Sequence, residues 1–231
     1  QYGEERLNGV PKVHEQTLAA HRAYFMNLLG EFGRELICCG KQGEAVEKIG
    51  KELENISVAW RLAIDQGQFA ELSSGAEALW GFICMRGWDR EGAEVFRESA
   101  AQLRSRSADH DSELYLRNLA AVLAFQGFCT IANSEHEART AAQESLSILR
   151  RLPVGKEMVF ALQLHIQLCH DESEKAQTIQ ECLDVARAFQ PNWWVPLCMF
   201  EASDLAINRG DYADAKTLLD EVLISAHQSP Y

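Results

Sequence analysis

The sequence predicts an all-α protein organised as an array of helical hairpins, and three observations support this prediction. Apolar residues recur along the chain with the alternating 3–4 spacing that defines one face of a helix. No stretch shows the period-two alternation, bounded by turn signals, that is typical of a strand. Small residues recur at comparable places in successive hairpins, at intervals of roughly 40 residues, which indicates a helical-repeat array.

About ten helices are expected, and glycine or proline residues separate most of them. The clearest stripe lies in the second helix, where six apolar residues are spaced 3, 4, 3, 4, 3: Val46, Ile49, Leu53, Ile56, Trp60 and Ala63. Pro153 and Pro191 are expected to end the sixth and eighth helices. The ten ranges are about 13–38, 44–66, 69–87, 92–103, 112–132, 135–151, 156–169, 173–189, 193–208 and 212–227.

These helices are expected to pair into five hairpins within one domain. The domain covers 12–231, and the opening residues 1–11, QYGEERLNGVP, are expected to be a stub of a preceding module. The hairpins are placed at about 13–66, 69–106, 111–151, 156–189 and 193–227. Four second helices carry a small residue on their first turn, which lets two helices approach closely; these are Gly92, Ala138, Ala176 and Ala215.

The tripeptide Arg209-Gly210-Asp211 matches an adhesion sequence but indicates a turn between two helices. Gly210 stands where the ninth helix must end, and glycine reaches left-handed φ and ψ at low cost. Asp211 precedes the apolar stripe of the tenth helix, where its side chain can cap free N–H groups.

The sequence GDYADAKTLLDEVLISA resembles the turn and second helix of a tetratricopeptide repeat. Its first helix, WWVPLCMFEASDLAINRG, fits less sharply, and the earlier units are longer than the usual repeat of about 34 residues. This resemblance implies a right-handed α-α superhelix whose concave face is lined by the first helix of each pair.

A second resemblance covers roughly residues 1–103. The segments HRAYFMNLLGEFGREL, LENISVAWRLAIDQGQ and LWGFICMRGWDREGAEVFRESA are similar to a region of large bacterial signalling ATPases, the STAND-type regulators that include LuxR-type ATP-dependent transcriptional regulators. This implies a cytoplasmic, non-catalytic sensor or interaction domain that follows the ATPase and winged-helix modules. The chain itself carries no G-x-x-x-x-G-K-[ST] phosphate loop and no basic recognition helix.

Charge and composition argue against several function classes. The net charge of −12 disfavours nucleic-acid binding, because the phosphate backbone repels an acidic surface. No apolar run reaches the roughly 18–20 residues of a membrane span, and no secretory signal opens the chain. The seven cysteines include no C-x-x-C pair, which is typical of a reduced, cytoplasmic protein.

The candidate binding residues are those expected on the concave face. They are Arg117 on the fifth helix, His165 on the seventh, and Trp194, Phe200, Asp204 and Asn208 on the ninth. The expected partner is a protein, a peptide or a small inducer, with no cofactor. Of the adjacent Trp193 and Trp194, one is expected to be buried while the other faces a groove, because neighbouring helical residues point about 100° apart.

His165, Cys169 and His170 are the best metal-like cluster in the sequence. His165 and Cys169 share a helix face, a spacing that can bind zinc, with a third ligand then needed from Cys182 or Cys198. Zinc sites usually take their ligands from closely spaced pairs of Cys or His residues, which this cluster lacks. The preferred interpretation is therefore that this helix faces the core and binds no metal, and no catalytic residue is expected in the chain.

The alternative function is a structural scaffold. Solenoids need capped ends, so we expect the uncapped last hairpin either to continue into further repeats or to mediate homo-oligomer formation.

Overall fold

The structure, a computed structural model, describes residues 11–37, 41–106, 112–189 and 193–228. Within these ranges it contains eleven α-helices and no strand, so the all-α prediction is confirmed. The stub predicted at 1–11 lies outside the described residues except for Pro11, which begins the first helix.

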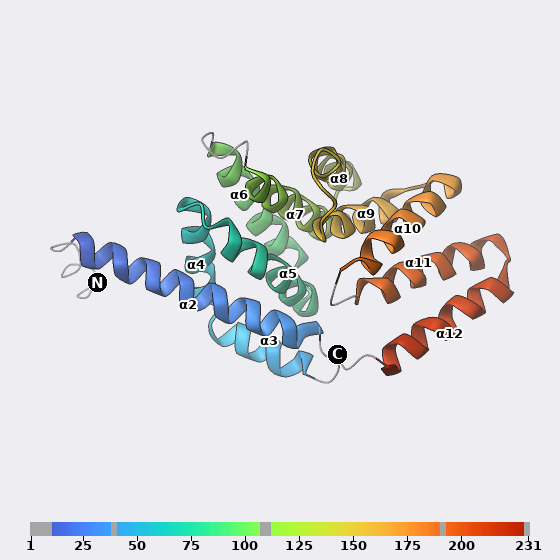
Figure 1. The fold of residues 1–231 in the computed structure, drawn as a ribbon, viewed down its shortest axis with the longest axis horizontal. Coiled ribbons are helices and arrows are strands. Elements are labelled where there is room, and N and C mark those ends of the chain that lie inside the picture. The colour runs from blue at the N-terminus through green and yellow to red at the C-terminus, as the bar shows by residue number, and fades with distance from the viewer. Residues whose placement is uncertain (1–10, 38–40, 107–111, 190–192, 229–231) are drawn as a thin grey trace.

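Figure 1 shows the helices following one another along an arc, from α2 at one end to α12 at the other. In chain order they are α2 (Pro11–Ile37), α3 (Gln42–Lys51), α4 (Leu53–Asp65), α5 (Phe69–Arg86), α6 (Asp89–Ser105), α7 (Glu113–Thr130), α8 (Glu135–Leu149), α9 (Glu157–Leu168), α10 (Glu172–Arg187), α11 (Trp194–Arg209) and α12 (Tyr212–Gln228).

The expected second helix is two helices, α3 and α4, which was not predicted. Glu52 separates them, and its backbone N–H donates to the carbonyl oxygen of Ile49, three residues back. This tightened turn leaves the apolar stripe in place, because Ile49 and Ile56 on either side of the break are both buried. The stripe therefore looked continuous in the sequence although the backbone is interrupted.

The contacts between helices follow a regular order. Each helix packs against the next in the chain, and a second series joins α2 to α5, α5 to α7, α7 to α9 and α9 to α11. The series α2, α5, α7, α9 and α11 is called here the first helices, and the helices that follow each of them, the second helices. The first helices therefore form a continuous layer along the arc.

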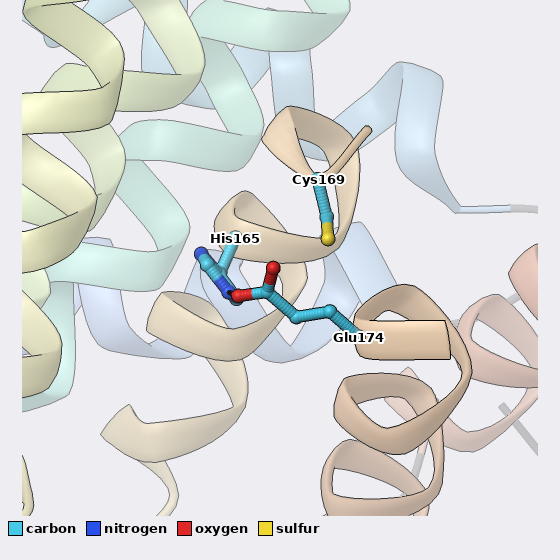
Figure 2. A group of neighbouring side chains, drawn as sticks. All are labelled: His165, Cys169 and Glu174. Atoms are coloured by element: carbon cyan, nitrogen blue, oxygen red, sulfur yellow. Dashed lines mark hydrogen bonds and ion pairs between the residues drawn. The ribbon is translucent and has the colours of Figure 1, made fainter. Parts of the chain in front are cut away.

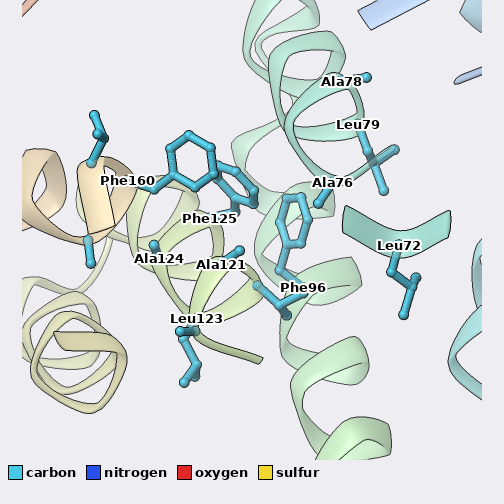
Figure 3. Close-up of a cluster of buried hydrophobic side chains, with 14 of the residues drawn as sticks. Leu72, Ala76, Ala78, Leu79, Phe96, Ala121, Leu123, Ala124, Phe125 and Phe160 are labelled. Atoms are coloured by element: carbon cyan, nitrogen blue, oxygen red, sulfur yellow. The ribbon is translucent and has the colours of Figure 1, made fainter. Parts of the chain in front are cut away.

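The largest hydrophobic core centres on α7 and α9, which are buried on nearly all of their faces. Phe125 of α7 lies between Phe96 of α6 and Phe160 of α9, with ring centroids 5.6 Å and 4.9 Å apart, and Figure 3 shows these three rings meeting. Side chains from α5, α6, α7 and α9 thus share one core, which fixes the relative positions of the central helices.

The turn interpretation of Arg209-Gly210-Asp211 is confirmed. Gly210 has a φ of +82°, in the left-handed region that favours glycine, and its N–H donates to the carbonyl oxygen of Ile207. Arg209 donates to the side chain and to the carbonyl oxygen of Glu172, at 3.1 Å and 3.0 Å, and so ties α11 to the start of α10.

The small residues predicted on the first turns of the second helices lie in the helix contacts. Ala138 and Ala215 are buried, as is Gly92, whereas Ala176 is half-buried. A Cβ atom added to Gly92 would lie only 2.6 Å from Cγ2 of Ile83 on α5 and 2.8 Å from Sγ of Cys129 on α7. The close approach of α6 to both helices therefore requires glycine here.

Ion pairs join α6 to α8 on the exposed side. Arg97 and Arg104 of α6 reach Glu137 and Glu144 of α8 at 2.9 Å and 2.6 Å, and both pairs join residues 40 apart in the sequence. None of the described helices has an apolar stretch long enough to span a bilayer.

Candidate functional site

Three of the six predicted binding residues share one face of α11. Phe200, Asp204 and Asn208 are exposed at four-residue intervals, and the Asn208 amide donates to Oδ2 of Asp204 at 3.3 Å. The Phe200 side chain is 55% exposed. This face therefore offers a partner an exposed aromatic ring, from Phe200, and an exposed carboxylate, from Asp204.

The other three predicted residues lie apart from that face and have partners within the chain. Arg117 on α7 donates to Glu113 at 2.7 Å, to Glu157 at 3.2 Å and to the carbonyl oxygen of Pro153 at 2.6 Å. With 12% of its side chain exposed, Arg117 holds the α8–α9 connection against α7. Trp194 is buried, with 6% exposed, and His165 of α9 contacts Glu174 of α10.

The structure instead shows an apolar groove of about 300 Å³ on the layer of first helices. Figure 1 shows the last part of α5 and the start of α11 facing each other on the inside of the arc, where this groove lies. It is called the inner groove and is lined by Gly33, Leu36, Glu77, Ala78, Trp80, Gly81, Cys84, Met85 and Trp193. Met85 and Cys84 are exposed, and Met85 is 49% exposed.

Among the residues that the structure describes, Glu77 is the only charged one that lines the inner groove. Its Oε1 accepts hydrogen bonds from the indole N–H groups of Trp193 and Trp194, each at 3.0 Å, and its Oε2 lies 3.9 Å from Nζ of Lys156. Two N–H dipoles and a lysine thus compensate a carboxylate that is only 19% exposed. The carboxylate fixes the orientation of both tryptophans across the inside of the arc.

Trp80 forms the aromatic wall of the inner groove. Its ring stacks on Phe125 at 5.3 Å and on Trp194 at 5.7 Å, so it continues the core outward to the groove. Its Nε1 atom is buried and has no hydrogen-bond partner among the residues that the structure describes. The indole ring, and not this buried N–H, is therefore the part of Trp80 that the groove presents.

A second groove of about 380 Å³ lies between α4, α5 and α6. It is called the outer groove. Trp60 lies at its base and donates its indole N–H to Oγ of Ser99 at 2.9 Å, and Val95 lines its edge. Trp60 is 3% exposed, as expected for a member of the predicted apolar stripe.

The metal-like cluster has a different composition from the one considered in the sequence. Glu174 at the start of α10, and neither Cys182 nor Cys198, lies beside His165 and Cys169, as Figure 2 shows. The Sγ atoms of Cys182 and Cys198 lie 3.2 Å from each other in the buried contact between α10 and α11. His170 points to a separate partner, Glu135, at 3.0 Å.

Glu77, Met85 and Trp193 were missed as candidate residues by sequence reasoning. Glu77 is the only charged residue between Leu72 and Met85, a signal that could have identified it. Trp193 was weighed together with Trp194, and the structure places Trp194 in the core and Trp193 in the groove. Local spacing gives the angle between two such neighbours but not which of them faces inward.

Comparisons of the chain with protein-family models, with curated proteins and with solved structures returned no significant match.

Proposed function

We propose that this chain is a non-catalytic interaction or sensor domain, built as a right-handed superhelix of five helical hairpins, that binds its ligand on the inner face. The five hairpins are α2 with α3 and α4, α5 with α6, α7 with α8, α9 with α10, and α11 with α12. The contacts between successive first helices support this grouping, since stacked hairpins meet through equivalent helices.

The spacing of ion pairs supports a repeat of about 40 residues. Arg97 with Glu137, Arg104 with Glu144 and Arg117 with Glu157 each join residues separated by 40 positions. A repeated separation is expected when neighbouring units have similar lengths and stack with the same geometry.

The inner groove is the observation that carries the binding proposal. It combines an apolar wall with one compensated carboxylate, and binding sites characteristically join an apolar surface to a few placed polar groups. The proposed ligand is a partner protein, a peptide or a small inducer that inserts an apolar group against Trp80 and Trp193.

We place the domain in a cytoplasmic regulator of the STAND or LuxR-type ATPase class, on the resemblance of the segments quoted above. The gene that encodes the chain tests this placement. We expect it to encode a nucleotide-binding module and a winged-helix module upstream of Gln1. A gene without an ATPase module would refute the class and leave the binding proposal standing.

Two matched variants test the binding proposal. Met85→Glu introduces a charge in the inner groove, and Val95→Glu does the same in the outer groove, at side chains that are 49% and 37% exposed. A partner is first captured from cells of the source organism on the immobilised wild-type chain, then purified and titrated against all three proteins by calorimetry. We expect Met85→Glu to weaken binding at least about tenfold, because a carboxylate must be desolvated in an apolar contact.

The two variants also distinguish the grooves. Affinity that falls with Val95→Glu and not with Met85→Glu would move the site to the outer groove. Affinity that is equal in all three proteins would refute binding in either groove.

A second candidate function, a self-associating scaffold, is favoured by exposed apolar side chains on the last two helices. Phe200, Ile207, Tyr212, Leu223 and Ile224 are each between 44% and 70% exposed. Adjacent exposed apolar residues indicate a surface that another chain covers. Sedimentation velocity over a hundredfold range of concentration tests this function, and a constant monomer mass would refute it.

A further inference from the structure

We propose that His165, Cys169 and Glu174 bind a zinc ion at the turn between α9 and α10. One ligand atom from each residue, His165 nitrogen, Cys169 Sγ and a Glu174 carboxylate oxygen, lies within 4.8 Å of the other two. Figure 2 shows the three side chains converging on one point from two helices. This site is separate from both grooves and does not depend on the proposed binding function.

The local backbone brings the three ligands together. His165 lies in the last turn of α9, and Cys169, four residues on, is the C-cap residue that directly follows the helix. Cys169 then has extended backbone angles, and Asp171 caps α10 by accepting from the N–H of Glu174 at 2.8 Å. This cap fixes the first turn of α10, which directs the Glu174 carboxylate back toward α9.

The donor atoms lie near the spacing of a tetrahedral zinc site. Zinc bonds of about 2.0–2.3 Å place the donor atoms of a tetrahedron about 3.3–3.8 Å apart. Nε2 of His165 is 3.1 Å from Oε1 of Glu174, and no two of the three ligand atoms are more than 4.8 Å apart. Binding would therefore require the donor atoms to shift by about 1 Å or less.

The donor set selects the metal. One imidazole, one thiolate and one carboxylate are the three ligand types of zinc, whereas magnesium and calcium take oxygen ligands only. Binding releases the Cys169 thiol proton to solvent and replaces the His165–Glu174 hydrogen bond with two metal bonds. Three protein ligands leave the fourth position of the ion for water, on the side where the Glu174 side chain is 57% exposed.

The experiment is a titration of the full chain with Co²⁺, which takes zinc sites and reports its ligands by absorption. We expect a thiolate-to-cobalt charge-transfer band together with the visible bands of tetrahedral cobalt, saturating at one ion and displaced by Zn²⁺. Zinc should also raise the Tm of the chain, because it binds only the folded turn.

Each ligand has a matched control in the same chain. His165→Asn is compared with His170→Asn, Cys169→Ser with Cys84→Ser, and Glu174→Gln with Glu172→Gln. The control residues have other surroundings: His170 contacts Glu135, Glu172 contacts Arg209, and Cys84 lies on α5. We expect each ligand variant to weaken zinc binding by about 100-fold or more, since loss of even an outer partner costs about 10–100-fold. The controls should keep the wild-type affinity.

The ligands are exposed or half-exposed at a turn, so the variants should fold, and circular dichroism checks this. A charge-transfer band that persists in Cys169→Ser would overturn the proposal, because every other cysteine, Cys38 and Cys39 included, remains in that variant. Equal losses in the variants and their controls, or no band in the wild-type chain, would overturn it as well.

Discussion

Replacing Glu77 by alanine tests whether the contact between α5 and the start of α11 holds the inside of the arc together. The change removes the acceptor of two indole N–H groups, from Trp193 and Trp194. A hydrogen bond to a charged group contributes about 1.5–3 kcal/mol when its partner is buried. Counting the full value for the buried Trp194 and about half for the half-buried Trp193, we expect a loss of about 2–4 kcal/mol.

The assay is urea unfolding followed by circular dichroism, on wild type and three variants. Glu77→Gln retains an acceptor oxygen and should lose about 1 kcal/mol, whereas Glu94→Ala removes an exposed carboxylate of α6 and should stay within about 0.5 kcal/mol of wild type. With Trp194→Phe as the second change, a double-mutant cycle should give a coupling of about 1–2 kcal/mol. A loss below about 0.5 kcal/mol for Glu77→Ala, or zero coupling, would refute the reasoning.

Three further predictions follow from the packing, the ion pairs and the thiol. Gly92→Ala should destabilise the chain by about 0.5–2 kcal/mol, because the added Cβ meets two core side chains. Gly43→Ala, where an added Cβ meets no described atom within 4 Å, should stabilise the chain by about 0.5–1 kcal/mol. Equal effects of the two changes in thermal unfolding would contradict the close approach at Gly92. Arg117→Ala should lower the free energy of unfolding in urea by about 2–4 kcal/mol, whereas Arg104→Ala, at an exposed side chain, should lower it by about 0.2–1 kcal/mol. Similar losses for the two variants would contradict the burial of the Arg117 side chain. Burial and, to a lesser degree, the Glu174 carboxylate raise the pKa of the Cys169 thiol. Glu174→Gln should therefore lower that pKa and speed the alkylation of Cys169 near neutral pH in the absence of metal. An unchanged alkylation rate, measured by peptide mass spectrometry, would count against the contact between Glu174 and Cys169.

Helix ends were predictable where a single residue stops or caps the helix through its own backbone angles or side chain. Gly210 ends α11 in the left-handed region, and Ser112, Ser134 and Asp171 cap the helices that follow them by accepting a backbone N–H. The break at Glu52 was not predictable from the apolar pattern, because α3 and α4 present the same stripe to the core.

The candidate sites depend on contacts between different helices, which the spacing of residues along the sequence does not predict. His165 and Cys169 were paired from their four-residue interval, but Glu174 joins them only through the tight turn into α10. The inner groove joins α2, α5 and the start of α11, so its lining depends on contacts between helices far apart in the sequence. A sequence pattern gives the apolar face of one helix but not which distant helix packs beside it.

The bond between Trp194 and Glu77 has a consequence for the order in which the chain folds. In a simple repeat array each unit touches only its neighbours, so folding can begin anywhere and spread stepwise. This contact joins residues 117 apart and bypasses helices α6 to α10. Its formation must wait until those helices have packed, since closing so long a loop earlier costs entropy that a single contact cannot offset. The chain is therefore expected to finish folding in one concerted step and to resist fraying from its C-terminal side.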